Sequence, residues 1–66
     1  MRIALHEARN AKGVTQEKTA QHLNITVRHY RSIELGKSGT SEDNWIKLYE
    51  YLQPSIPLQD VMRNTI

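Results

Sequence analysis

The chain has 66 residues, 38% of them hydrophobic and 24% charged, a composition typical of one small folded domain. It contains no cysteine, which excludes disulfides and thiolate metal sites. No apolar run approaches the roughly 18 residues that a membrane span needs, and the first residues are too polar for a secretion signal. We therefore expect a single domain over residues 1–66 that works in the cytoplasm.

The net charge of +2 is unevenly distributed along the chain. Residues 1–37 carry seven basic side chains against three acidic ones, a net charge of +4. Residues 38–66 carry two basic side chains against four acidic ones, a net charge of −2. The basic part suits a polyanion such as nucleic acid, although a skew of this size is common among small proteins.

The first two predicted helices are bounded by residues that cap and stop helices. Apolar and small residues recur at helical spacing over about residues 1–11, and Gly13 provides a left-handed stop. Thr15 is a suitable N-cap for a second helix over residues 16–23. Asn24 can end that helix because asparagine tolerates the left-handed conformation.

The third helix is predicted over Val27–Leu35, between an N-cap at Thr26 and a stop at Gly36. Only Asn24 and Ile25 separate it from the second helix, which is too tight a connection for an antiparallel hairpin. Two short helices joined in this way are typical of a helix-turn-helix unit, in which they cross at about 90–120°. We place that unit at about residues 16–35.

The third helix has two chemically different faces. At 100° per residue, Tyr30 and Ile33 define a buried side, and Glu34 turns back toward the body of the domain. The opposite side carries Arg28, Arg31 and Ser32, with Val27 at its edge. Two arginines on an exposed helix are by themselves most often solubilising groups, so the helix-turn-helix context is what favours a binding role.

The rest of the chain predicts two further helices and no strand. The fourth ends at Leu52 and is capped either by Thr40 with Asp43 or by Ser41 with Asn44. Its apolar face carries Trp45, Leu48, Tyr49 and Leu52. A short last helix begins at Pro57, in a segment whose apolar side chains exceed what a small core needs: Ile56, Leu58, Val61, Met62 and Ile66. The predicted fold is an all-α, five-helix bundle.

Over roughly residues 2–62 the sequence resembles the Cro/CI-type (XRE-like) helix-turn-helix repressors of phages and other mobile elements. The matching residues are Arg9, Lys12-Gly13-Val14-Thr15-Gln16-Glu17, Ala20, Leu23, Ile25-Thr26, Ile33-Glu34 and Gly36-Lys37. The resemblance implies a small bundle of the lambda-repressor-like type. Three positions depart from the family's usual residues: Thr19 replaces leucine, Asn24 replaces glycine and Tyr30 replaces a smaller aliphatic side chain.

The resemblance also implies roles for individual residues. Those expected to contact DNA bases are Val27, Arg28, Arg31 and Ser32, because arginine can pair bidentately with guanine and valine can pack on a thymine methyl. Those expected to contact the DNA backbone are Gln16, Thr26 and Lys37. Arg9 and Glu34 match a structural ion pair. The family usually dimerises through its C-terminal end, which here implies a homodimer through Ile56, Leu58, Val61 and Met62.

No catalytic or metal-binding pattern is visible in the sequence. His6, His22 and His29 have neither the spacing nor the cysteine or carboxylate neighbours of a metal site. We expect no enzyme, no cofactor, no metal and no small-molecule ligand. The favoured function is a sequence-specific, double-stranded DNA-binding transcriptional regulator, repressor-like and nucleoid-associated when bound. The alternative is a protein-interaction module on the same fold, such as an antitoxin or an antirepressor-binding protein.

Overall fold

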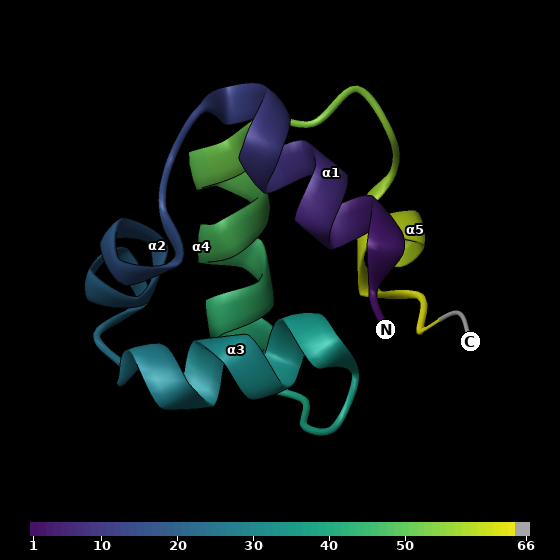
Figure 1. Cartoon of the computed structure of the whole chain (residues 1–66). Coiled ribbons are helices and arrows are strands. Elements are labelled where there is room, and N and C mark those ends of the chain that lie inside the picture. The colour runs from purple at the N-terminus through teal and green to yellow at the C-terminus, as the bar shows by residue number, and fades with distance from the viewer. Residues whose placement is uncertain (65–66) are drawn as a thin grey trace.

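The computed structural model describes residues 1–64. Within that range the chain forms five helices and no strand, which confirms the predicted all-α fold. They are α1 (Ile3–Lys12), α2 (Gln16–Leu23), α3 (Val27–Leu35), α4 (Glu42–Leu52) and α5 (Leu58–Met62). In Figure 1, α4 stands at the centre, α3 crosses its lower end, α2 packs on one side, and α1 and α5 pack on the other. α3 therefore forms one edge of the bundle.

The helices begin where hydroxyl side chains can cap them. Thr15 and Thr26 each accept a hydrogen bond of 3.1 Å from the backbone N–H three residues later. For α4 the cap is Ser41, which accepts from the Asn44 backbone N–H at 3.2 Å. Thr40 accepts instead from the Asn44 side-chain amide at 3.0 Å. Both hydroxyls predicted as possible caps of this helix therefore bond to Asn44.

Three helices end at the predicted left-handed residues, which are Gly13, Asn24 and Gly36. A fourth left-handed residue, Gln53 at φ +48°, ends α4 before Pro54. The start of α1 differs from the prediction. It begins at Ile3 rather than Met1: Arg2 is the N-cap, with a non-helical ψ of 81°, and its backbone N–H bonds to the Glu34 carbonyl of α3 at 2.9 Å.

One hydrophobic core joins all five helices. Its buried members are Leu5, Ala20, Leu23, Tyr30, Ile33, Trp45, Leu48, Leu52 and Val61. Thr19, where the family favours leucine, is also fully buried, and its hydroxyl donates to the Thr15 carbonyl one turn earlier at 2.8 Å. The substitution therefore exchanges apolar volume for a satisfied hydrogen bond.

The C-terminal apolar segment needs one correction. Val61 is 0% exposed and belongs to the core of the single chain, so it is not available to a second copy. Ile56 and Leu58 are half-buried against the same core, and Met62 is 37% exposed. Ile66 lies outside the described residues. The mismatch arises because α5 packs across α1 and α4, which covers more of the segment than its sequence indicated.

Candidate nucleic-acid interface

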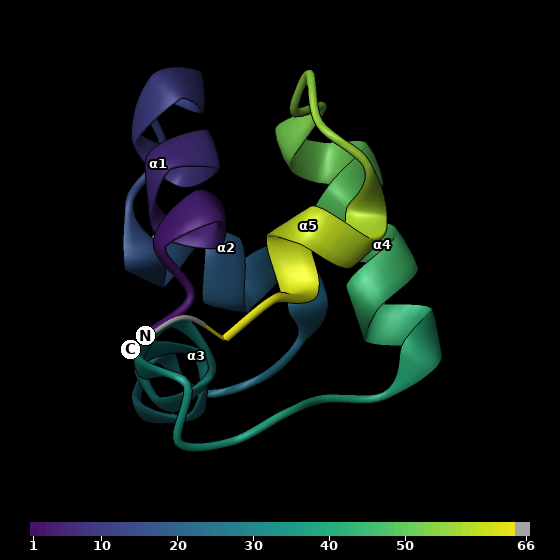
Figure 2. The same ribbon diagram turned by 90° about the vertical axis from the view of Figure 1, so that its right-hand side faces the viewer.

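α3 presents one side to the core and the other to solvent. Tyr30, Ile33 and Glu34 are buried, whereas Arg28 and Arg31 are exposed. In Figure 1, α3 lies at the lower edge of the bundle with the other helices above it, and Figures 1 and 2 show the loop that follows α3 passing below the helix. This is the two-faced helix that the helical periodicity predicts.

The remaining residues of the predicted reading face are less exposed. Val27 and Ser32 are half-buried, and Val27 packs partly on the core, so only part of its side chain can reach a ligand. The Ser32 carbonyl accepts hydrogen bonds from the backbone N–H groups of Lys37 at 2.9 Å and Ser38 at 3.2 Å. These bonds fold the following loop back onto α3, where the Lys37 side chain is exposed.

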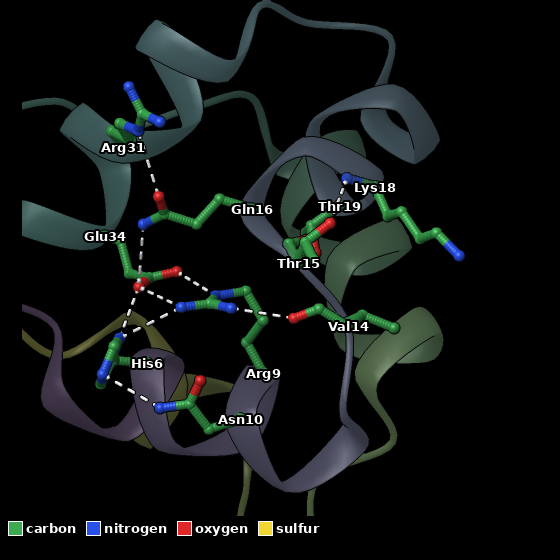
Figure 3. Close-up of polar contacts among 10 residues, drawn as sticks. All are labelled: His6, Arg9, Asn10, Val14, Thr15, Gln16, Lys18, Thr19, Arg31 and Glu34. Atoms are coloured by element: carbon green, nitrogen blue, oxygen red, sulfur yellow. Dashed lines mark hydrogen bonds and ion pairs between the residues drawn. The ribbon is translucent and has the colours of Figure 1, made fainter.

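Two of the residues expected to contact the DNA backbone lie at helix N-terminal ends. Thr26 is exposed, and its hydroxyl serves as the acceptor of the cap, which leaves its proton able to bond a phosphate oxygen. Gln16, the first residue of α2, is half-buried, and its side-chain amide points toward α3 rather than toward solvent (Figure 3).

Arg9 of α1 and Glu34 of α3 form the ion pair that the resemblance implies. Arg9 Nε donates to Glu34 Oε2 at 2.9 Å, and its Nη2 donates to Oε1 at 3.2 Å, so the two groups are joined by two parallel hydrogen bonds. The Arg9 and Glu34 side chains are 10% and 3% exposed. A further bond from Arg9 Nη1 to the Val14 carbonyl, at 2.8 Å, holds the α1–α2 connection to the same pair.

His6 and Asn10 extend this cluster to the surface of α1. The Nδ1 atom of His6 lies 2.6 Å from Glu34 Oε1, and its Nε2 lies 3.1 Å from the Asn10 amide nitrogen. A carboxylate oxygen can only accept, so the short contact to Glu34 is a hydrogen bond donated by His6 Nδ1.

The surroundings of Glu34 favour its charged form. Burial by itself would raise the pKa of the Glu34 carboxyl, but the hydrogen bonds from Arg9 and His6 outweigh that effect and hold the pKa below its usual value. The hydrogen bond to Glu34 is also the largest effect on the Arg9 guanidinium and raises its pKa. Both partners therefore stay ionised at neutral pH.

Gln16 connects this buried pair to the exposed face of α3. Its Nε2 donates to Glu34 Oε1 at 3.3 Å, and its Oε1 accepts from Arg31 Nε at 3.1 Å (Figure 3). Both ends of the amide are thus occupied, and a phosphate contact through this amide would have to share or replace them. The Arg31 side chain is 54% exposed, and its bond to Gln16 uses Nε rather than either terminal nitrogen of the guanidinium.

Glu17 is a second, weaker neighbour of Arg31. Its Oε2 lies 3.9 Å from Arg31 Nη2, and both side chains are more than half exposed. Exposed ion pairs at this distance typically contribute less than about 1 kcal/mol, so an incoming anion can displace Glu17 easily.

Sequence reasoning missed the contacts of Arg2. Its Nη1 donates to the carbonyls of Ile33 and Ser38, both at 2.6 Å, and its Nε donates to the Met62 carbonyl at 2.9 Å. The same guanidinium lies 5.1 Å from the ring centre of Trp45. No periodicity marks such a residue, because it precedes α1 and all its partners are more than 30 positions away.

Tyr30, which stands where the family usually has a smaller aliphatic residue, places a polar atom in the core. Its hydroxyl is buried and has no hydrogen-bond partner among the described residues. Burial, followed by the nearby Glu34 carboxylate, raises the pKa of the Tyr30 hydroxyl, which therefore remains protonated.

Two surface cavities lie outside α3 on the described chain, the smaller one beside Trp45, Leu58 and Met62. The larger one, of about 500 Å³, lies between α1 and the segment after α4, and α3 contributes none of its lining. Residues 1–64 contain no group of three or more His, Asp or Glu side chains placed to bind a metal ion. None of the helices described is long and apolar enough to cross a membrane.

Comparison with protein families identifies the architecture. The helix-turn-helix family model matches residues 5–58, a span that includes all of α2, α3 and α4. Comparisons with the curated proteins and with the solved structures gave no significant match. Members of the matched family are DNA-binding regulators and generally not enzymes. Because the match covers most of the sequence, the chain belongs to the helix-turn-helix family, of the Cro/CI (XRE-like) type.

Proposed function

We propose that this protein is a sequence-specific, double-stranded DNA-binding repressor from a phage or another mobile element. The observation that supports this proposal is the outward position of Arg28 and Arg31 on a helix whose other side is fixed in the core. A recognition helix enters the major groove in this way, with base-reading side chains on its outer face. The protein would act by occupying an operator, in the compartment that holds the DNA, which for a bacterial or phage protein is the cytoplasm.

The proposed contacts divide by chemistry. Arg28 and Arg31 would read guanine O6 and N7, while the part of Val27 outside the core would pack on a thymine methyl. Ser32 would contribute a shorter hydroxyl contact to a base. Thr26, Lys37 and the backbone N–H groups at the start of α2, beginning with Gln16, would bind phosphates and set the register on the duplex.

We also propose that the protein binds DNA as a homodimer through its C-terminal region. Met62 is exposed there, and Ile56 and Leu58 retain part of their apolar surface. A twofold axis at this end would place two copies of α3 about one turn of DNA apart, ~34–36 Å. Sedimentation of the protein with and without its selected duplex tests this, and strict monomers on the DNA would rule the dimer out.

Selection from a random duplex pool tests the function directly. We expect a recovered consensus with two related half-sites, bound more tightly than unrelated DNA by at least about a thousandfold at physiological salt. Affinity should fall steeply with the logarithm of salt concentration because phosphate contacts release counterions. A chain that recovers no consensus, and binds an acidic protein instead, would favour the protein-interaction alternative.

Variants separate the two kinds of contact. Arg28→Ala and Arg31→Ala should each relax the preference at one position of a half-site, at a cost of about 1–3 kcal/mol for the best base. Lys37→Ala should weaken binding to all duplexes alike and reduce the salt slope by about one. Uniform weakening by the arginine variants would reassign them to phosphates.

A further inference from the structure

Arg2 joins four separate parts of the molecule with one side chain. Its guanidinium donates to carbonyls of α3, of the loop after α3 and of the end of α5, and it lies over the Trp45 ring of α4. Its backbone N–H adds a bond to the Glu34 carbonyl. In Figures 1 and 2 the N-terminal end of the chain accordingly lies beside the end of α3.

These bonds provide hydrogen-bond donors to carbonyls at the C-terminal end of α3. The last four carbonyls of a helix have no partner within it. In α3 two of these four, those of Ile33 and Glu34, receive a donor from Arg2. α3 also has no basic residue in its own last turn, where a positive charge is favourable. Arg2 supplies that charge from the start of the chain.

A second bridge supports the same end of α3. The N-terminal ammonium donates to the Asn64 side-chain oxygen at 2.8 Å, and the Asn64 amide donates to the Gly36 carbonyl at 3.0 Å. Gly36 and Ser38 flank Lys37, and each has its carbonyl bonded, to Asn64 and Arg2 respectively. The backbone on both sides of Lys37 is therefore fixed by residues far away in the sequence.

We propose that Arg2 is a positioning residue for DNA binding. It fixes where α3 ends and how the loop carrying Lys37 leaves it, and so places the Lys37 ammonium at the phosphate backbone. The inference rests on the proposed function, because Lys37 meets a phosphate only if the chain binds DNA. Arg2 itself donates hydrogen bonds to backbone carbonyls, and we assign it no contact with the duplex.

Hydrogen exchange on the free protein tests the structural half of this proposal. In Arg2→Gln, the amides of Gly36, Lys37 and Ser38 should exchange about tenfold faster, as expected when charged hydrogen bonds are lost, while the Tyr30 amide in the middle of α3 changes little. Arg63→Gln is the matched control, since it removes one exposed arginine near the end of α5 that pairs only with Asp60 among the described residues. It should leave these amides unchanged.

Should Arg2→Gln fail to fold, Arg2→Lys serves as the second variant. It keeps the positive charge but loses the guanidinium fork that reaches three carbonyls, so the same amides should show a smaller, still local, acceleration. Equal acceleration at all amides, or none, in the variant that folds would overturn the proposal, because Arg2 would then only add to overall stability or do nothing.

A double-mutant cycle on DNA tests the functional half. With the selected duplex, Arg2→Gln and Lys37→Ala should each weaken binding about tenfold, and Lys37→Ala should cost little more once Arg2 is replaced. An unchanged effect of Lys37→Ala in both backgrounds would contradict the positioning role. If the natural sequence binds no duplex at all, the proposed function fails, while the exchange pattern still decides whether Arg2 holds the end of α3.

Discussion

Gln16 and Arg31 lie on different helices and are joined by a hydrogen bond of 3.1 Å, from Arg31 Nε to the Gln16 side-chain oxygen. The other end of the same amide donates to Glu34, which is itself held by Arg9. A partly exposed arginine on the reading face is therefore connected to a buried ion pair through one amide. Such a connection limits the orientations of a long side chain before it meets a ligand, which lowers the entropy lost on binding.

We expect Gln16→Ala to weaken the discrimination that Arg31 provides. The Arg31 guanidinium would regain rotational freedom, so the preference at its base pair should fall even though Arg31 is present. Competition binding with single-base operator variants measures this, and a double-mutant cycle should give a coupling of about 0.5–3 kcal/mol between Gln16 and Arg31. Arg28 shares no hydrogen bond or ion pair with Gln16 in the described chain, and Gln16→Ala with Arg28→Ala is the additive control. Additivity in both cycles would refute the connection.

We expect replacement of one partner of the Arg9–Glu34 pair to lower the free energy of unfolding more than replacement of both partners. Arg9→Met or Glu34→Gln leaves one buried charge without its partner, a loss of roughly 3–5 kcal/mol. A domain of this size has a total stability of roughly 3–10 kcal/mol, so either variant should be close to unfolding. Arg9→Met combined with Glu34→Leu should recover much of the loss, as urea unfolding will measure. A double variant as unstable as the sum of the single ones would contradict this expectation.

The stability of the domain should fall in acid because of Glu34. Its pKa in the folded chain lies below the ordinary glutamate value of about 4.3, so the unfolded chain binds its proton first as the pH drops. The stabilisation is complete above that ordinary value and is lost as the pH falls through the lower, folded-state pKa. Urea midpoints between pH 7 and pH 3 measure the slope. The Arg9→Met, Glu34→Leu double variant, which lacks the carboxyl, should show a shallower slope, and equal slopes would assign the acid sensitivity elsewhere.

Tyr30→Phe should leave the free energy of unfolding unchanged or increase it by about 1 kcal/mol. A buried hydroxyl without a partner costs roughly 1–3 kcal/mol, and phenylalanine keeps the ring that fills the core. Thermal unfolding of the two proteins at neutral pH measures the difference. A clear loss of stability would show that the hydroxyl does bond within the core, where the nearby Glu34 carboxylate is an available acceptor.

The helix bounds could be predicted from the sequence because the residues that begin and end a helix act locally. Thr15 and Thr26 begin helices, and Gly13, Asn24 and Gly36 end them, at the predicted positions. Each of these residues acts within one turn of the backbone. Periodicity likewise separated Tyr30 and Ile33 from Arg28 and Arg31, since it depends only on the 100° step of the helix. The family resemblance, which rests on the same short-range spacing, was confirmed as well.

The contacts that prepare α3 for a ligand depended instead on how the helices pack. The Gln16 amide faces Glu34 and Arg31 because α2 crosses α3 at that point, and Arg2 reaches the end of α3 because α1 begins there. The burial of Val61 follows in the same way from α5 lying across α1 and α4. A helical pattern states which side chains share a face, but it contains no information about which group on another helix that face will meet. Among these long-range contacts only the Arg9–Glu34 pair was expected beforehand, from the family resemblance, and the contacts of Gln16 and Arg2 became visible only in the assembled bundle.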